Sequence, residues 1–393
     1  MAAVFFSGHM IDRPGRAAPR FPAALVPRIA QRLAAELARL GASDGFASLA
    51  CGGDILFLEA MLARGGRVHV TLPCAREDFR KDCVDVIPGA DWATRFDRIL
   101  AAASSVEVLG EQYASDNAAA SECCSRMLVG LAQRCAAEQG EAASVLALWD
   151  GRPGDAFGGT HSIVDFCLRH GFTVHWMQDL VSVGSAGTHE LAPLAAGTSS
   201  AVQRDSMLGE APQQICAAIF ADAVASSKLH EREVPRFVRE YLGCAMQALQ
   251  AKAIVPLVRN TWGDGLYLVF DTVREAGVFA LDFRDRIVAT DWQALGFSRI
   301  PNVRIGAHAG PLYRIYDPVL GQWSYTGSHV TRTARLEPVT EPGKVFATLT
   351  FTALAAAERV SEFACELVGR RQLVKDAGEV TVFELRGAVR PGR

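Results

Sequence analysis

The stretch Arg259 to Phe270, RNTWGDGLYLVF, decides how the second half of the chain is expected to fold. A strand-like apolar run follows Gly263-Asp264-Gly265, and such a triplet is typical of a tight hairpin turn because glycine readily adopts positive φ angles. Taken alone, these residues explain Asp264 equally well as a turn residue and as a chemical group. The rest of the chain must decide between the two interpretations.

Composition sets broad limits on the class of protein. The chain has 393 residues, of which 50% are hydrophobic and 21% charged, as expected for a globular protein of two or three domains. The net charge of -3 argues against a general nucleic-acid or anionic-membrane surface. Ten cysteines form no CxxC pair and no metal-spaced His/Cys cluster, and no apolar run is long enough for a membrane helix. We expect a cytoplasmic protein that binds neither nucleic acid nor membrane.

Residues 182–214 separate two halves of similar size. This segment is rich in small residues, glycine and proline and lacks sustained apolar periodicity, which is typical of a connection between domains. The sequence therefore predicts a first domain over residues 1–181 and a second over residues 215–393.

The first half alternates short apolar runs with helical patterns. Examples are AVFFSGH, FPAALVPRIAQRLAAELARLGA and RVHVTLP, and a later repetition begins at SVLALWDGRPGD. Strand, glycine-bearing turn, helix and strand in that order predict an α/β domain, a Rossmann-like parallel sheet with helices on its faces.

Glycine-bearing turns in this half are candidate ligand loops. In parallel sheets, ligands bind beyond the carboxyl ends of the strands, where loops and helix N-termini offer backbone N–H groups to anions. An alternative is that the glycines serve only tight turns. The candidate residues are Gly8 and His9, then Gly52, Gly53 and Asp54, then Gly158, Gly159 and Thr160.

This half loosely resembles the Rossmann-like SLOG and lysine-decarboxylase-like domains, which bind nucleotide-type ligands or hydrolyse nucleotide N-glycosidic bonds. The hydrolytic members carry a PGGxGTxxE signature, whereas this chain has FGGTHSIVD, with Ile163 at the position of the acid. The resemblance therefore implies a small nucleotide-like ligand and makes hydrolysis doubtful.

The second half predicts an α+β, ferredoxin-like arrangement. An apolar strand in ICAAIFADAVASS ends in Asp222, and a helix, the Asp264 hairpin, a second helix and a further strand follow it. In this fold the first strand and the hairpin are neighbours, so Asp222 is expected beside Asp264. Two adjacent carboxylates repel each other unless cations lie between them, and a pair of divalent ions completed by a triphosphate would satisfy both.

Five segments then carry a specific resemblance to class III nucleotidyl cyclases. They are IFADAVASS, NTWGDGLYLVF, NVRIGAHAGPL, YTGSHVTRTARLEPVTEPGKVFAT and LVKDAGEVTVFEL, and they span residues 215 to 385. The resemblance implies conversion of a nucleoside triphosphate to a 3',5'-cyclic nucleotide and pyrophosphate in a homodimer. It implies two divalent cations, Mg or Mn, held by Asp222, Asp264 and the carbonyl of Ala223.

The same resemblance assigns residues to the partner's site. Arg335 would stabilise charge on the phosphoryl group, Thr331 stands where the family has an Asn that positions the ribose, and Lys375 would contact the triphosphate. The Thr331 departure implies weaker positioning without loss of chemistry. Retention of both aspartates and of Arg335 favours an active enzyme over a degenerate domain that only binds nucleotide or transmits a signal.

The substrate base stays open at this stage. Adenylyl cyclases of the family read adenine with a Lys and an Asp, and guanylyl cyclases use Glu and Cys; here these positions hold Asn260 and Ser324. ATP is favoured as the commonest substrate of the family, with the pyrimidine (UTP or CTP) cyclases of antiphage defence as the alternative. The first domain is expected to sense a ligand and to set the geometry of the cyclase dimer.

Overall fold

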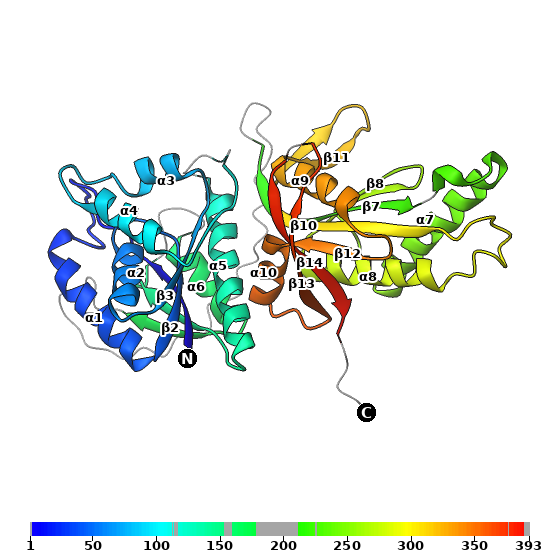
Figure 1. The fold of residues 1–393 in the computed structure, drawn as a ribbon. Helices are drawn as coiled ribbons and strands as arrows, with labels where there is room; N and C mark the ends of the chain where they lie inside the picture. Colours follow the sequence, from blue (N-terminus) through cyan, green and yellow to red (C-terminus); the bar gives the residue numbers. More distant parts are fainter. Residues whose placement is uncertain are drawn as a thin grey trace.

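The computed structural model describes residues 2–111, 113, 117–152, 159–177, 211–224, 226–375 and 377–388. Within these ranges the chain forms two lobes, each built on its own sheet (Figure 1). Most of the expected connection falls outside the described residues. The first strand of the second lobe begins at Gln213, two residues before the predicted boundary.

The first lobe has a six-stranded sheet in which every strand pair is parallel, in the order β4-β3-β2-β1-β5-β6. The order reverses at β1, which lies between β2 and β5. Loops that follow β1 and β5 therefore diverge at the carboxyl edge of the sheet, where ligands bind in such folds. The strands are β1 (Ala2–Gly8), β2 (Ala42–Ala47), β3 (Arg67–Leu72), β4 (Ser105–Val108), β5 (Ser144–Leu148) and β6 (Thr173–Met177).

Helices cover both faces of this sheet, as the alternating sequence pattern predicts. Figure 1 shows α1, α2 and α4 on one face and α5 and α6 on the other. The apolar stripe of α1, for example, buries Ile29, Leu33 and Leu37 at intervals of four residues. The helices are α1 (Val26–Arg39), α2 (Gly53–Ala63), α3 (Arg76–Cys83), α4 (Trp92–Ala102), α5 (Ala118–Glu138) and α6 (Thr160–Arg169).

The second lobe follows the predicted strand, helix, hairpin, helix, strand order. Its central strands run β10-β7-β9-β8, the sheet order of a ferredoxin-like fold, and β12, β14 and β13 extend the sheet beyond β10. The first elements are β7 (Gln213–Val224), α7 (Val234–Ala251), β8 (Val258–Trp262), β9 (Gly265–Phe270), α8 (Val273–Ala289) and β10 (Asn302–Asp317). The remaining ones are β11 (Gln322–Thr326), which pairs with β10, α9 (Ser328–Leu336), β12 (Val345–Thr348), α10 (Leu349–Ala357), β13 (Phe363–Gln372) and β14 (Glu379–Gly387).

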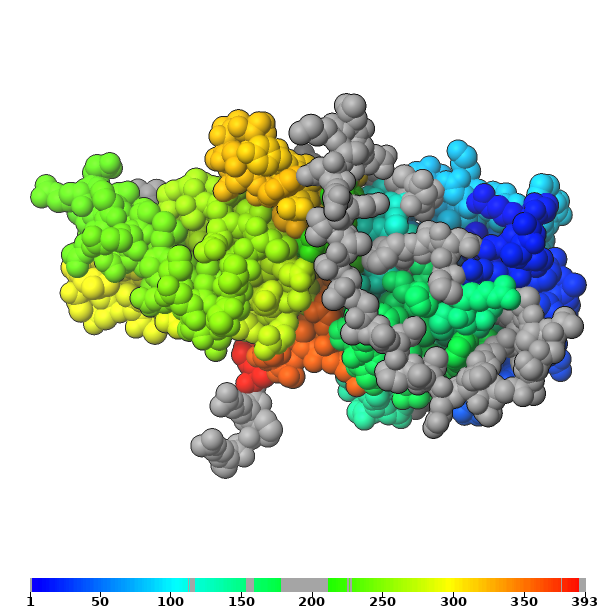
Figure 2. All heavy atoms as spheres, turned by 180° about the vertical axis from the view of Figure 1, so that it is seen from behind, coloured from blue at the N-terminus to red at the C-terminus, as the bar shows by residue number. Residues whose placement is uncertain are grey.

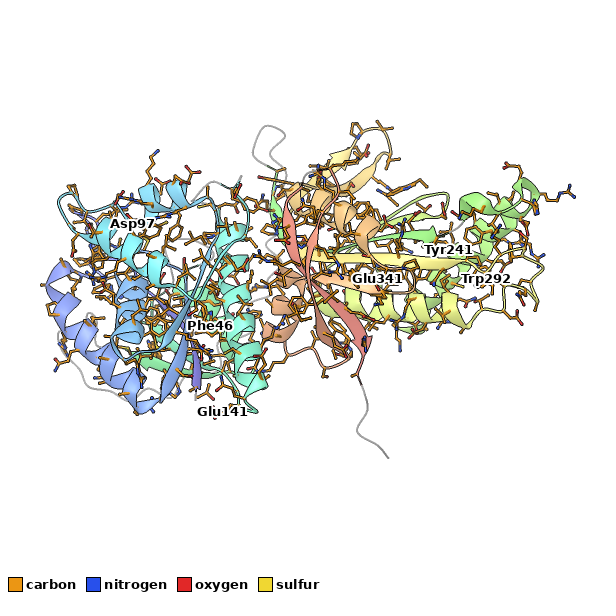
Figure 3. The ribbon with its side chains drawn as sticks, in the orientation of Figure 1. Phe46, Asp97, Glu141, Tyr241, Trp292 and Glu341 are labelled. Atoms are coloured by element: carbon orange, nitrogen blue, oxygen red, sulfur yellow. The ribbon has the colours of Figure 1, made fainter. Side chains whose placement is uncertain are left out.

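Aromatic side chains hold α7 and α8 together on one face of this sheet. Tyr241 of α7 meets Phe283 of α8 edge to face, with ring centroids 5.2 Å apart, and Phe237 lies 5.8 Å from Trp292. Figure 3 labels Tyr241 and Trp292 within this layer. Large buried rings of this kind contribute most of the apolar area that stabilises a small α+β domain. The opposite face carries α9 and the β10–β11 hairpin.

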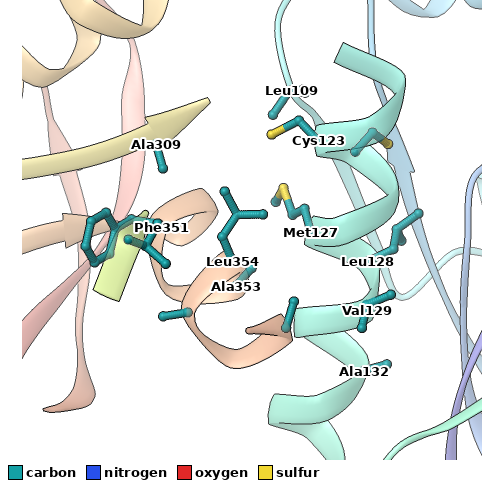
Figure 4. Packing of buried hydrophobic residues seen from close by; sticks show 14 of the residues in the cluster. Leu109, Cys123, Met127, Leu128, Val129, Ala132, Ala309, Phe351, Ala353 and Leu354 are labelled. Atoms are coloured by element: carbon teal, nitrogen blue, oxygen red, sulfur yellow. The ribbon is translucent and has the colours of Figure 1, made fainter. Parts of the chain in front are cut away.

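The two lobes share one apolar core through α5 and α10, which Figure 4 shows facing each other. Met127 of α5 and Leu354 of α10 are both buried in this seam. The helices approach so closely that a Cβ on Gly130 would lie 1.7 Å from the carbonyl oxygen of Ala353. Seen from behind, the lobes adjoin along the middle of the molecule (Figure 2). The first lobe is therefore packed against the second and not merely tethered to it.

None of the helices in the described ranges is both long enough and apolar enough to cross a membrane.

Candidate functional site

Two carboxylates meet at one end of the β7–β9 pair. Asp222 lies near the end of β7, and Asp264 lies in the β8–β9 turn, where Gly263 has a φ of 65°. The register pairs Ala221 with Leu266, which brings the turn to the Asp222 end of the strand. Burial and the negative charge of Asp264 raise the pKa of Asp222 above its usual value. The predicted adjacency of the two aspartates is thus present within one chain.

Arg304 is the cation that faces this pair. It lies opposite Asp222 in the antiparallel β7–β10 register, and its Nη2 donates to Asp222 Oδ2 at 3.2 Å. Its Nε lies 3.0 Å from Glu337 Oε1 just after α9, an ion-pair contact without hydrogen-bond geometry. Burial raises the pKa of Glu337 to about 7, and the charge of Asp222 adds to this effect while Arg304 opposes it.

Arg304 and Glu337 were not singled out from the sequence. The strand pairing that places Arg304 opposite Asp222 joins residues 82 positions apart, and no local pattern encodes it. The available signal was the alternation of β10, which puts Arg304 and the residues two positions away on the same face of the sheet.

The donor set of the acid pair fits a hard divalent cation. Asp222 and Asp264 supply carboxylate oxygens, and the backbone carbonyl of Ala223, which accepts from Ser226 Oγ at 3.4 Å, supplies a third oxygen nearby. The described residues contain no group of three or more His, Cys, Asp or Glu side chains placed to hold a metal. Side chains alone would therefore leave such an ion incompletely coordinated, and a phosphate ligand would supply the remaining oxygens.

The expected base-reading residues lie on β8 and β11, two strands that contact each other without pairing in the sheet. Asn260 of β8 accepts a hydrogen bond at Oδ1 from Gln322 Nε2 of β11 at 3.2 Å. Ser324, two residues further along β11, is buried. A second bond, from Tyr267 Oη to the carbonyl of Tyr325 at 2.8 Å, fixes β11 over β9. Gln322 belongs to this region although the sequence analysis did not select it.

Thr331 and Arg335 lie on α9, one turn apart. Thr331 is exposed, and its Oγ1 donates to the carbonyl of Gly327 at 3.3 Å. Arg335 is half-buried in the last turn and, within the described residues, makes no hydrogen bond and no ion pair. The structure places neither residue in contact with Asp222 or Asp264 of the same chain.

Lys375 lies far along the sheet from the acid pair. It is exposed in the connection between β13 and β14 and has a φ of 57°, unusual for a residue with a side chain. β14 is separated from β7 by β12 and β10. The structure therefore does not bring Lys375 to the aspartates of its own chain.

The glycine loops of the first lobe do converge at the carboxyl edge of its sheet. Gly8 ends β1, and the carbonyl of the adjacent His9 accepts from the N–H of Gly53, at the start of α2, at 3.0 Å. Ser7 Oγ donates to Oγ1 of Thr160, the first residue of α6, at 3.4 Å. Gly52 and Gly159 are the N-cap residues of α2 and α6, and Gly158 lies outside the described residues.

Asp54 fills the N-terminus of α2. Its buried carboxyl accepts from the N–H of Ala50 at 3.2 Å, and burial raises its pKa to about 7. Because Gly53 also donates within the protein, this helix start is already engaged and offers few free N–H groups to an anion.

His9 has polar partners that the sequence analysis did not include. Its Nε2 lies 3.2 Å from Asp150 Oδ1, and Arg20 Nε lies 3.7 Å from Asp150 Oδ2. The side chain of Asp150 is only 4% exposed. Burial lowers the pKa of His9, although the carboxylate of Asp150 opposes the shift. Asp150 follows β5, so this cluster lies where the strand order reverses.

Comparison with known proteins found similar solved structures that cover slightly less than half of this chain. No protein-family model and no curated protein matches the chain. The chain is similar to the adenylyl cyclase CyaB from P. aeruginosa at 14% identity, over 47% of this chain and 100% of that chain, with a TM-score of 0.40. It is similar to the guanylate cyclase domain of RhGC from Catenaria anguillulae, in complex with GTP, at 16% identity, over 46% and 100%, with a TM-score of 0.39. An adenylate cyclase from Trypanosoma brucei is 19% identical over 47% and 95%, with a TM-score of 0.39.

Proposed function

We propose that this protein is a nucleotidyl cyclase that converts a nucleoside triphosphate, ATP by preference, to a 3',5'-cyclic nucleotide and pyrophosphate. The observation that carries the proposal is the approach of Asp222 and Asp264 at the end of the β7–β9 pair, where burial and the negative charge of Asp264 raise the pKa of Asp222. A pair of carboxylates held in this way is stabilised when divalent cations, Mg or Mn, bind between them.

The chain's own residues would bind and orient the triphosphate. Asp222, Asp264 and the carbonyl of Ala223 would hold two cations, which when bound neutralise the phosphates and lower the pKa of the 3'-hydroxyl. The contact of Arg304 at 3.2 Å favours the anionic form of Asp222 and so opposes the rise in its pKa. The 3'-oxygen then bonds to the α-phosphorus as the bond to pyrophosphate breaks, and the hydroxyl proton leaves to solvent.

Arg335, Thr331 and Lys375 would act on the substrate held by a partner subunit. None of the three lies at the acid pair of its own chain, and Arg335 has no partner within the described residues. A guanidinium left unpaired on a helix is suited to receive charge from another molecule, here the phosphoryl group during transfer. The active unit is therefore proposed to be a homodimer with two composite sites.

An exposed apolar surface on the β10–β11 hairpin supports dimer formation. Large apolar side chains exposed on one hairpin mark an interaction surface more often than chance exposure. Trp262 at the tip of the neighbouring β8–β9 hairpin is 56% exposed and extends this surface. The exposed hairpin residues are Tyr313, Ile315, Tyr316, Val319, Leu320 and Trp323.

The amide pair Asn260 and Gln322, together with Ser324, would contact the base. These side chains are uncharged and offer both donors and acceptors, so they suit adenine and also the edges of uracil or cytosine. A pyrimidine cyclase, of the kind that acts in antiphage defence, is therefore the second candidate substrate class. The product of the reaction distinguishes the two.

The non-enzymatic alternative is a regulatory module that binds nucleotide without turnover. The contact between Arg304 and Asp222 favours it, because the arginine already compensates one carboxylate without a metal. Retention of Asp264, which forms no ion pair within the described residues, favours the enzyme. The first lobe is proposed to sense a small nucleotide-like ligand at the edge formed by His9, Asp150 and Thr160.

The test is to incubate the purified full chain with ATP, GTP, CTP and UTP separately, with Mn or Mg, and to identify the products by mass spectrometry. A single cyclic nucleotide that appears only with metal supports the proposal and names the base. Asp264→Asn should abolish the product, whereas Asp285→Asn, on the exposed side of α8, is the matched control and should not. Nucleotide binding without product in all four cases would support the regulatory module.

A further inference from the structure

We propose that Tyr113 of the first lobe is a positioning residue that holds helix α9 of the second lobe and so sets the placement of Arg335. The inference rests on the proposed cyclase function. The contact between this one side chain of the first lobe and the helix that carries Thr331 and Arg335 would then control the reaction.

Tyr113 belongs to the first lobe, but its side chain contacts the second lobe. It belongs to the connection between β4 and α5, and its side chain is buried against the second lobe. Its hydroxyl donates to the carbonyl of Pro311 on β10 at 3.2 Å. Its ring stacks on the imidazole of His329, with centroids 5.7 Å apart and planes inclined by 22°. His329 is the second residue of α9.

A buried polar chain fixes His329 from the other side. His329 Nδ1 lies 2.6 Å from His308 Nε2, and His308 Nδ1 lies 2.6 Å from Thr348 Oγ1 at the start of α10. The two imidazoles stack with centroids 4.8 Å apart. A Cβ at position 310 would lie 2.5 Å from His329 Nδ1, so Gly310 makes room for the ring. His329 is thus held between β10 and Tyr113.

The titratable groups at the start of α9 are buried or half-buried, as this packing requires. Burial lowers the pKa of Arg332, which follows His329 by one turn, and the nearby groups of Tyr113 and Glu111 oppose the shift. Burial also lowers the pKa of both His308 and His329, so the pair is neutral and one ring donates to the other. The N-terminal turn of α9 therefore has two neighbours from the first lobe and a neutral polar anchor on β10.

Through these contacts, a displacement in the first lobe can move α9 and with it Arg335. Arg335 follows His329 by six residues on a rigid helix of nine residues, so rotation or translation of its first turn moves the guanidinium. The connection that bears Tyr113 follows β4 at the carboxyl edge of the parallel sheet and leads into α5, which packs on β1 and β2. A change at that edge reaches α9 through contacts that are present in the structure.

The experiment compares Tyr113→Phe and Tyr113→Ala in the full chain with the parent. The phenylalanine variant keeps the stacked ring and loses the hydroxyl, with its bond to Pro311 and its hydrogen-bond interaction with Ser328 at the start of α9, so its kcat should stay within about threefold of the parent. The alanine variant removes the ring from His329 and should lower kcat by about ten- to a hundredfold with KM little changed, because the substrate and metal contacts on β7 and β9 are intact.

Hydrogen exchange over residues 328–336 gives a readout that needs no turnover. Tyr113→Ala should accelerate exchange of these α9 amides at least about tenfold, and Tyr113→Phe should not. Trp92→Leu is the control, since Trp92 is buried on α4 within the first lobe, away from the seam with α10. It should lower the unfolding midpoint and leave both α9 exchange and kcat unchanged.

The outcomes separate this inference from the proposed function. Unchanged α9 exchange in a folded Tyr113→Ala protein overturns the positioning role, whether or not the parent is active. Accelerated exchange in a parent that turns over no triphosphate keeps the contact and overturns the cyclase. If Trp92→Leu reproduces both effects of Tyr113→Ala, the loss reflects general destabilisation and the inference is wrong.

Discussion

Arg304 and Asp222 are directly opposite each other in neighbouring antiparallel strands, and the guanidinium contacts the carboxylate at 3.2 Å. The same arginine lies 3.0 Å from Glu337. The single guanidinium thus contacts two carboxyl groups, one of which, Glu337, has a pKa raised to about 7, while the charge of Asp264 also acts on Asp222. An excess of negative charge at this end of the sheet is what the proposed cation site requires, because bound cations would relieve the repulsion between the carboxylates.

Asp264→Asn should abolish the proposed cyclase activity and slightly stabilise the apo protein. The substitution removes a metal ligand, which is expected to lower turnover by about a hundredfold or more. It also removes the charge that disfavours ionisation of Asp222. Because both groups are partly exposed, the gain in unfolding free energy should be at most about 1 kcal/mol. Thermal melts in EDTA measure it, and a lower midpoint would contradict the interpretation.

Mixing Asp264→Asn with Arg335→Ala should restore activity that neither variant has alone. In a composite dimer, one of the two sites of the mixed species has an intact Asp264 from one subunit and an intact Arg335 from the other. Random exchange makes half of the dimers mixed, so about a quarter of the parental activity is expected. Titration of one variant with the other measures this. Failure to recover activity after verified subunit exchange would place Arg335 in the site of its own chain.

Asn260→Ala should relax the choice of base without removing the chemistry. The amide of Asn260 is oriented by Gln322 at 3.2 Å, and its loss leaves the two aspartates in place. The ratio of kcat/KM between the preferred triphosphate and the others should fall by about tenfold, the cost of one lost hydrogen bond in recognition. Gln322→Ala, which leaves Asn260 without its partner, should have a smaller effect. An unchanged ratio in both variants would remove these residues from the base site.

Asp54 should make stability depend on pH in the direction opposite to that of an ion-paired carboxylate. Its pKa is raised to about 7 in the folded protein, so the folded state holds a proton that the unfolded state releases. Stability therefore falls as pH rises from about 4 to about 7. Asp54→Asn removes this dependence on pH. The unfolding free energy of the parent minus that of the variant should therefore be about 2–3 kcal/mol smaller at pH 8 than at pH 5. Urea unfolding at the two pH values tests it, and a difference that does not change with pH would refute the raised pKa.

Gly130→Ala should destabilise the whole chain. The added methyl group meets the carbonyl of Ala353 across the seam, and overpacking of this kind costs about 1–3 kcal/mol or more. Gly243→Ala is the matched control, because Gly243 lies in α7 with no atom within 4 Å of the added carbon. It should be neutral or stabilising by about 0.5–1 kcal/mol. Equal unfolding midpoints for the two variants would show that the seam is loose.

The sequence predicted those features of the second lobe that depend on local pattern. Apolar periodicity and the Gly263-Asp264-Gly265 turn were enough for the strand, helix, hairpin, helix, strand order, and that order was enough to place Asp222 near Asp264. Arg304 was not predictable in the same way, because its role arises from strand register and not from any motif.

Contacts between the lobes were also beyond the reach of sequence patterns. Tyr113 and Pro311 are 198 positions apart, and nothing in the sequence around either residue indicates the other. In the first lobe, the glycine loops were placed at the correct edge of the sheet. Their engagement by Asp54 and by the carbonyl of His9 depends on how the loops fold back on the protein, which composition does not encode.

The close approach of Gly130 to Ala353 also bears on how such a chain can be inherited. Two lobes joined by a connection alone can be exchanged between genes as separate modules, each with its own surface. Here a graft of either lobe onto a new partner must bring a helix with a glycine at the crossing point and a small residue facing it. The two lobes are therefore expected to be inherited together when genes recombine.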